Sequence, residues 1–75
     1  MPPLADRVRA ELAHGTLHYA LEMALDAALK AGQDALPDTR GRPAAERFAV
    51  ALQAATDVLD GLALEMTGGG TAAGQ

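Results

Sequence analysis

Apolar residues recur at helical spacing along two long stretches of the chain, which are separated by a run of turn-forming residues. The first stretch, residues 3–31, is rich in Ala, Leu, Glu, Arg and Lys, and Gly32 follows it as a helix stop. The second stretch begins at Pro43, which suits the first turn of a helix, and runs to residue 67. The pattern therefore predicts helices over about 3–31 and 43–67, joined by a loop over 32–42.

The second helix is clearly amphipathic at about 100° per residue. Its larger apolar side chains share one face, and they include Phe48, Leu52, Leu59 and Leu62. Polar side chains occupy the opposite face, among them Glu46, Gln53, Asp57 and Asp60. This helix therefore has one face to bury against a neighbour.

The first helix carries a more irregular pattern. An i, i+4 ridge of leucines follows its C-terminal half and consists of Leu17, Leu21, Leu25 and Leu29. A second ridge, rotated around the axis, follows the N-terminal half and consists of Leu4, Val8 and Leu12. Between the ridges lie polar residues, namely Arg7, Glu11, His14, His18 and Glu22. Burying such side chains without partners is costly, so this part of the stripe needs an explanation.

The composition limits how much core a single chain can build. Of the 75 residues, 18 are Ala and 11 are Leu, and there is no Ile. A chain of this size is close to the lower limit for a core that outweighs chain entropy. We therefore expect an all-α fold, an antiparallel two-helix hairpin over residues 1–67, which homodimerisation completes to a four-helix bundle. A higher oligomer or docking on a larger protein partner would serve the same purpose. The residues predicted to form the interface are the apolar ones of the two helix faces, namely Leu17, Leu21, Leu25, Leu29, Phe48, Leu52, Leu59 and Leu62.

Composition and charge also exclude several classes of protein. The chain has no Cys, so it can form neither disulfides nor a thiolate metal site, and a reducing compartment, the cytoplasm, is expected. Its net charge of −4 argues against binding nucleic acid or an anionic membrane surface. No signal-peptide pattern and no uncharged 18-residue stretch is present. Residues 68–75, which are rich in Gly, are expected to form a flexible tail.

One group of residues has the spacing of metal ligands. Glu11 and His14 form a Glu-x-x-His pair on one helical face, and His18 lies one turn further on. Folding the chain antiparallel about residue 38 brings Glu65 level with this pair. A homodimer would then supply two copies of each ligand, a carboxylate–imidazole set that suits Fe or Mn.

This ligand set resembles the ferritin-like pattern, in which paired helices contribute a Glu and a Glu-x-x-His motif. The resemblance implies a dimeric metal-binding protein, with di-metal oxidase activity as the enzymatic possibility. The order differs from that of the ferritin-like pattern, because there the lone Glu precedes Glu-x-x-His, whereas here Glu65 follows it.

Two simpler interpretations of the polar group remain open. Glu11–His14 and His18–Glu22 are ordinary i, i+3 and i, i+4 pairs, each contributing a few tenths of a kcal/mol, at the rim of an interface. Alternatively, the group could dock against a charged residue of a partner protein.

A separate structural expectation concerns two glycines. The same antiparallel folding places Gly15 level with Gly61, which predicts a close approach of the two helix backbones at that height.

The sequence holds no catalytic arrangement of the common kinds. No Thr is placed with a His base and an orienting acid, the chain has no Ser, and no Gly-rich turn joins a strand to a helix. The leading hypothesis is therefore a non-enzymatic protein–protein interaction or structural module, such as an accessory subunit or assembly adaptor. The alternative is the ferritin-like metal-binding dimer.

Overall fold

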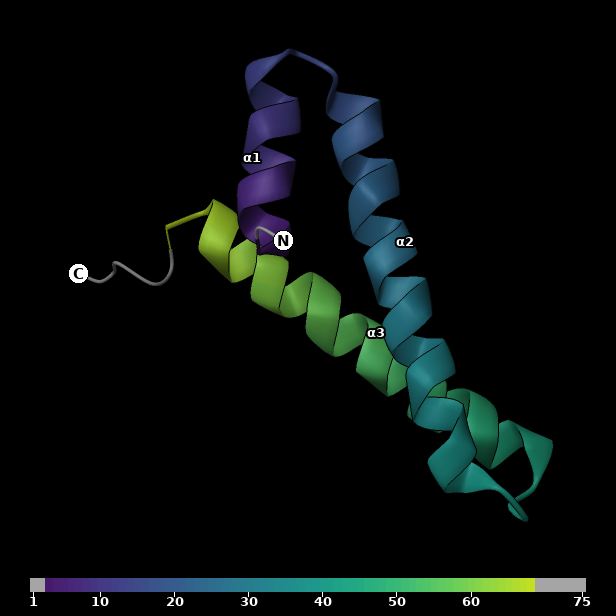
Figure 1. The fold of residues 1–75 in the computed structure, drawn as a ribbon. Helices are drawn as coiled ribbons and strands as arrows, with labels where there is room; N and C mark the ends of the chain where they lie inside the picture. Colours follow the sequence, from purple (N-terminus) through teal and green to yellow (C-terminus); the bar gives the residue numbers. More distant parts are fainter. Residues whose placement is uncertain (1–2, 69–75) are drawn as a thin grey trace.

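Three α-helices and one short 3₁₀ helix make up the part of the chain that the structure describes. The structure, a computed structural model, describes residues 3–68, and all regular structure within this range is helical. Helix α1 spans Leu4–Ala13, α2 spans Leu17–Ala35 and α3 spans Ala44–Met66, with a short 3₁₀ helix, η1, at Leu36–Thr39 between α2 and α3 (Figure 1). The expected all-α class is thus confirmed, whereas the expected number of long helices, two, is wrong.

The helix predicted over 3–31 is broken at Gly15. This residue has a φ of 79°, a left-handed conformation that glycine adopts without the steric cost of a Cβ. The amide of Gly15 donates to the carbonyl of Leu12 at 2.9 Å, which closes the last turn of α1. The chain then reverses, so that α1 and α2 run side by side in opposite directions (Figure 1). Helix propensity alone could not reveal this break, because one glycine is tolerated inside many helices.

Gly32 does not end α2, which continues to Ala35. Instead, Gly32 is buried where α2 crosses α3, and a Cβ added at this position would lie 2.9 Å from the carbonyl oxygen of Ala51. The close backbone approach predicted at Gly15 and Gly61 is therefore wrong, since within residues 3–68 an added Cβ at either glycine would meet no atom of another element within 4 Å. The approach occurs between Gly32 and Ala51.

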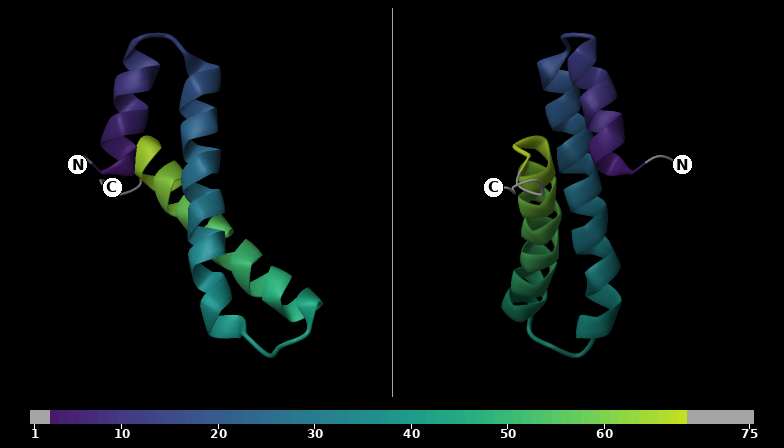
Figure 2. Two further views of the ribbon diagram at one scale, coloured as in Figure 1. Left: turned by 45° about the vertical axis from the view of Figure 1, so that its right-hand side comes forward. Right: turned by 90° about the vertical axis from the view of Figure 1, so that its left-hand side faces the viewer.

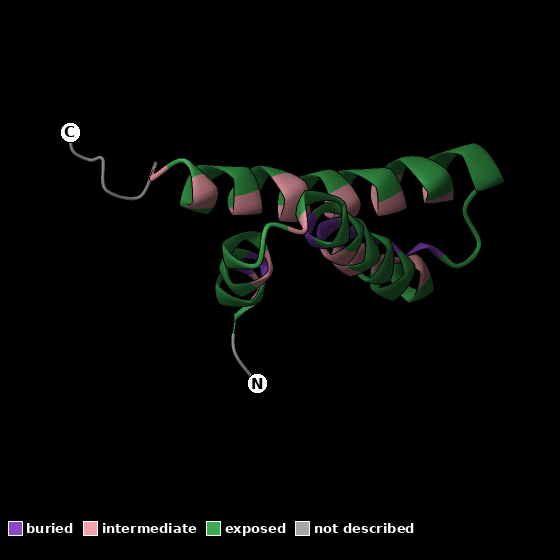
Figure 3. Ribbon diagram, turned by 90° about the horizontal axis from the view of Figure 1, so that it is seen from above, coloured by how far each residue is buried: buried purple, intermediate pink, exposed green. Residues whose placement is uncertain are grey.

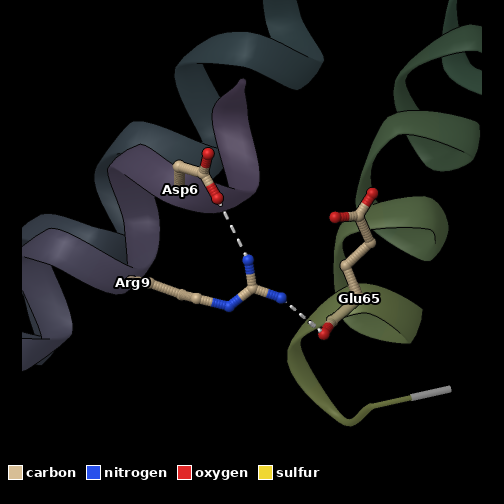
Figure 4. Close-up of polar contacts among 3 residues, drawn as sticks. All are labelled: Asp6, Arg9 and Glu65. Atoms are coloured by element: carbon tan, nitrogen blue, oxygen red, sulfur yellow. Dashed lines mark hydrogen bonds and ion pairs between the residues drawn. The ribbon is translucent and has the colours of Figure 1, made fainter. Parts of the chain in front are cut away.

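Helix α2 is the central element and contacts both of the other helices. Helix α3 returns obliquely across it, and its C-terminal end reaches the start of α1 (Figures 1 and 2). There Arg9 links the two elements, because its Nη2 donates to the backbone carbonyl of Glu65 at 3.0 Å while its Nη1 pairs with Asp6 at 3.2 Å (Figure 4). A positive side chain at this position also complements the C-terminal end of the α3 dipole. The predicted range 43–67 lies within one residue of α3 at each end.

The core consists mainly of alanine. Among residues 3–68, the buried apolar residues are Ala5, Val8, Ala20, Ala24 and Ala28. Three of these lie at i, i+4 spacing on α2, and Gly32 continues the row. Small side chains let the helices approach closely, but each buries little area. Viewed from above, burial is concentrated where α2 meets its neighbours, and the outer faces of the helices are exposed (Figure 3).

The connection between α2 and α3 is fixed by Thr39, which is 2% exposed. Its hydroxyl donates to the carbonyl of Leu36 at 2.6 Å and accepts a hydrogen bond from Nε of Arg47 at 3.1 Å. The bond from Arg47 ties η1 to the first turn of α3, so the connection holds both helix ends together. The flexible tail expected at 68–75 lies, apart from Gly68, outside the described residues.

Candidate functional site

The leucine ridge of α2 faces outward along its whole length. Leu17, Leu21, Leu25 and Leu29 are all exposed, with exposed fractions of 73, 59, 49 and 59%. The last three each follow directly after a buried alanine of α2, so the ridge stands beside the core rather than in it. These four leucines are among the residues predicted to form an assembly interface, and no residue of the described range 3–68 buries them.

Helix α3 adds a second exposed apolar group. Phe48 and Leu52 are exposed by 66% and 53%, whereas Leu59 and Leu62, further along the same face, are half-buried. No residue of α3, all of which lies within the described range, is fully buried. The predicted face of α3 is therefore only partly covered by α1 and α2.

A groove joins the two exposed groups into one surface. It lies between α2 and α3, has a volume of about 250 Å³, and its deeper positions are small residues, Ala28, Gly32, Ala51 and Ala55. Leu29, Phe48 and Leu52, all more than half exposed, also line it. Among its described lining residues none is charged, and Gln33 is the sole one with a polar side chain.

We refer to Leu17, Leu21, Leu25, Leu29, Phe48 and Leu52, together with the groove, as the apolar surface. Six large side chains exposed to this degree leave on the order of 700 Å² accessible to water, which is above the few hundred Å² at which a contiguous patch indicates an interaction site. Its size, more than any single residue, makes this surface the candidate functional site.

The predicted metal ligands at the α1–α2 turn are engaged in local contacts. The hydroxyl of Thr16 contacts both the carboxylate of Glu11 and its carbonyl oxygen, the latter at 3.0 Å. His14 places Nδ1 2.9 Å from the carbonyl oxygen of Ala10. His18 lies beyond the break at Gly15, with its ring centroid 4.0 Å from that of Tyr19. Of these contacts, those between Thr16 and Glu11 span the turn between α1 and α2.

Glu65 lies elsewhere. It lines a shallow hollow with Pro3 and Leu4 at the start of α1, whereas Glu11 and His14 lie at the opposite end of that helix. Within residues 3–68 no group of three or more His, Cys, Asp or Glu side chains is close enough to hold a metal ion. The local pairs of the simpler interpretation, Glu11–His14 and His18–Glu22, are not among the ion pairs of the described residues. One chain thus does not bring the predicted ligands together.

Sequence reasoning missed the groove, although a signal for it was present. Ala20, Ala24, Ala28 and Gly32 form an i, i+4 row of small residues on α2. Such a row permits close helix packing, and it predicts that the larger residues beside it are displaced to the edge of the contact. The exposed position of Leu29 follows from that geometry.

Comparisons with known proteins add no relative. The chain matches no protein-family model, and searches of curated proteins and of solved structures find no match either. None of the helices between residues 3 and 68 combines the length and apolar character needed to cross a bilayer. Function must therefore be argued from the apolar surface itself.

Proposed function

We propose that the protein is a small non-enzymatic protein–protein interaction or structural module, of the accessory-subunit or assembly-adaptor kind, which acts through its apolar surface. The observation that carries this proposal is the exposure of six large apolar side chains on α2 and α3 in a chain whose described core is four alanines and one valine. A monomeric protein gains nothing from exposing its largest side chains while it buries its smallest ones.

The energetic argument supports an interaction role. Burial of apolar surface contributes about 25 cal/mol per Å², so the half-covered leucines represent stabilisation that the isolated fold does not use. An interaction that covers them gains this term without further ordering of the helices, because α2 and α3 already hold the surface in place. A cytoplasmic location and the metal-binding alternative remain predictions that rest on the sequence.

Site-specific photo-crosslinking in the source cells tests this function. A photoreactive amino acid is placed at Leu25, on the apolar surface, and in a matched variant at the neighbouring Asp26, which is exposed and lies outside it. We expect a discrete adduct at position 25 and little or none at position 26, because photoreactive groups couple only to a surface that is in contact.

Two results would contradict the proposal. No adduct at position 25 would mean that the apolar surface stays uncovered in the cell. Equal adducts at positions 25 and 26 would mean that contact is non-specific. The mass of the adduct further identifies what covers the surface, since a second copy of the chain gives twice the monomer mass.

A further inference from the structure

We propose that a second copy of this chain covers the apolar surface in a two-fold symmetric dimer, in which Phe48 of each copy enters the groove between α2 and α3 of the other. This inference rests on the proposed function and names its partner. Three observations carry it: the area of the surface, the lack of charge in its groove, and the presence of a hollow and a protruding side chain on the same face.

The area agrees with what a dimer requires. A standard protein–protein interface buries about 800 Å² on each partner, close to the roughly 700 Å² that the six exposed side chains leave open. A much larger partner surface is not needed to cover it. A second copy also completes both cores at once, because each chain lacks the same layer of large side chains.

The charges favour a partner of the same kind. The chain has a net charge of −4, and a basic partner would be recognised through acidic side chains at the contact. The groove has none: its described lining is apolar apart from Gln33. Two copies can therefore meet there without placing like charges opposite each other, although the rest of their surfaces repel weakly.

The surface is also self-complementary in shape. A two-fold interface requires a self-complementary patch, and a protruding group near a matching hollow meets that requirement because each copy makes the same contact with the other. Phe48, the sole phenylalanine of the chain, lines the edge of a groove of about 250 Å³, is 66% exposed there, and the deeper positions of the groove, such as Gly32 and Ala55, are small. That space accommodates one phenyl ring, and aromatic side chains at such positions contribute most to binding.

Sedimentation equilibrium of the purified full chain, from low micromolar to submillimolar concentration, tests the inference. We expect the unmodified protein to be a dimer. Phe48→Ala should raise the dissociation constant of this dimer at least about 30-fold, which is the loss of affinity expected when a residue central to an interface is truncated. Tyr19→Ala is the matched control, because Tyr19 is half exposed but lies outside the groove. This variant should dimerise as the unmodified protein does.

A second measurement does not depend on whether Phe48→Ala folds. The chain has no Trp, so Phe48→Trp introduces a single fluorescent reporter of similar shape. Its emission should shift to shorter wavelength over the same concentration range in which the mass doubles, whereas Tyr19→Trp should show no shift. Circular dichroism of each variant shows whether the helices are retained.

Several outcomes would overturn the inference. In sedimentation, these are a monomer at all concentrations, a dimer that Phe48→Ala leaves intact, or an assembly that grows beyond two copies. In fluorescence, it is an emission of the Phe48→Trp variant that is already blue-shifted in the monomer. The last would mean that the chain covers its own groove. A monomer that still gives a specific adduct at position 25 in cells, of a mass other than the dimer, would leave the proposed function standing with a different partner.

Discussion

Gly32 and Gly61 both lie inside helices, but their surroundings differ. An added Cβ at Gly61 meets nothing within 4 Å, whereas at Gly32 it would meet the backbone carbonyl oxygen of Ala51 at 2.9 Å. We therefore expect Gly61→Ala to raise the free energy of unfolding by about 0.5–1 kcal/mol through helix propensity. Gly32→Ala should lower it by about 1 kcal/mol or more, because α3 must move away from α2.

Thermal melting followed by circular dichroism measures both effects, since about 1 kcal/mol shifts the melting temperature of a domain of this size by about 4–8 °C. The two variants control for each other, because both replace a helical glycine by alanine. Equal shifts in the same direction would show that α2 and α3 are not in close contact at Gly32.

At the same scale, His14 allows a test of the metal-binding alternative. Its side chain is exposed, and its one side-chain hydrogen bond among residues 3–68 is with the carbonyl oxygen of Ala10 in α1. His14→Ala should change the free energy of unfolding by no more than about 0.5 kcal/mol, as for other surface positions. Native mass spectrometry of protein purified without chelator should show no bound Fe or Mn in either form. Two metal ions per dimer in the unmodified protein, lost in the variant, would instead establish the ferritin-like site.

At the scale of the elements, the turn at Gly15 determines the topology. Gly15 adopts the left-handed conformation, which costs a residue with a Cβ about 1–2 kcal/mol. Gly15→Ala should therefore lower the free energy of unfolding by that amount. The flanking residues favour helix, so the variant should also shift the chain towards one continuous helix over α1 and α2. Thermal melting measures the first effect and small-angle scattering the second, as an increase in maximum dimension. Gly61→Ala is the control, and equal behaviour of the two variants would contradict the role of Gly15.

What the sequence could predict at this scale depends on the range of the forces involved. The start and end of α3 were predictable, because Pro43 and Gly68 act locally on the backbone. The break at Gly15 and the passage of α2 through Gly32 were not, because the same residue type has opposite roles at the two positions. Gly32 lies at the close crossing of α2 with Ala51 of α3, which is a tertiary feature, whereas an added Cβ at Gly15 would meet open space.

The same distinction applies to the candidate site. The leucine ridge could be located from the sequence, since its spacing is a local property, and the structure leaves it exposed. Its role as an assembly surface stays a prediction. The pairing of Glu65 with Glu11 and His14 was inferred from a two-helix fold. Once the chain breaks at Gly15, α1 folds back and its N-terminal end, rather than its C-terminal end, lies beside Glu65.

At the scale of the whole molecule, the ridge and the core should respond differently to the same chemical change. Ala24 lies in the core and is 6% exposed, whereas Leu21 and Leu25, which lie near it in the sequence, belong to the exposed ridge. A single Ala24→Asp should unfold the protein, because an unpaired charge in the core costs several kcal/mol. The double variant Leu21→Asp/Leu25→Asp adds two charges at exposed positions, so the helices should remain.

Association with a second copy should make the melting temperature depend on protein concentration. The melting temperature of the unmodified protein should rise with concentration, as it does when binding stabilises the folded state by mass action, and that of the double variant should not. Light scattering on the same samples should give the mass of one chain for the double variant. If the double variant unfolds as Ala24→Asp does, the ridge belongs to the core of a single chain. If it folds and keeps the unmodified mass, the leucines lie outside any assembly contact, because two buried carboxylates on each copy could not be accommodated there.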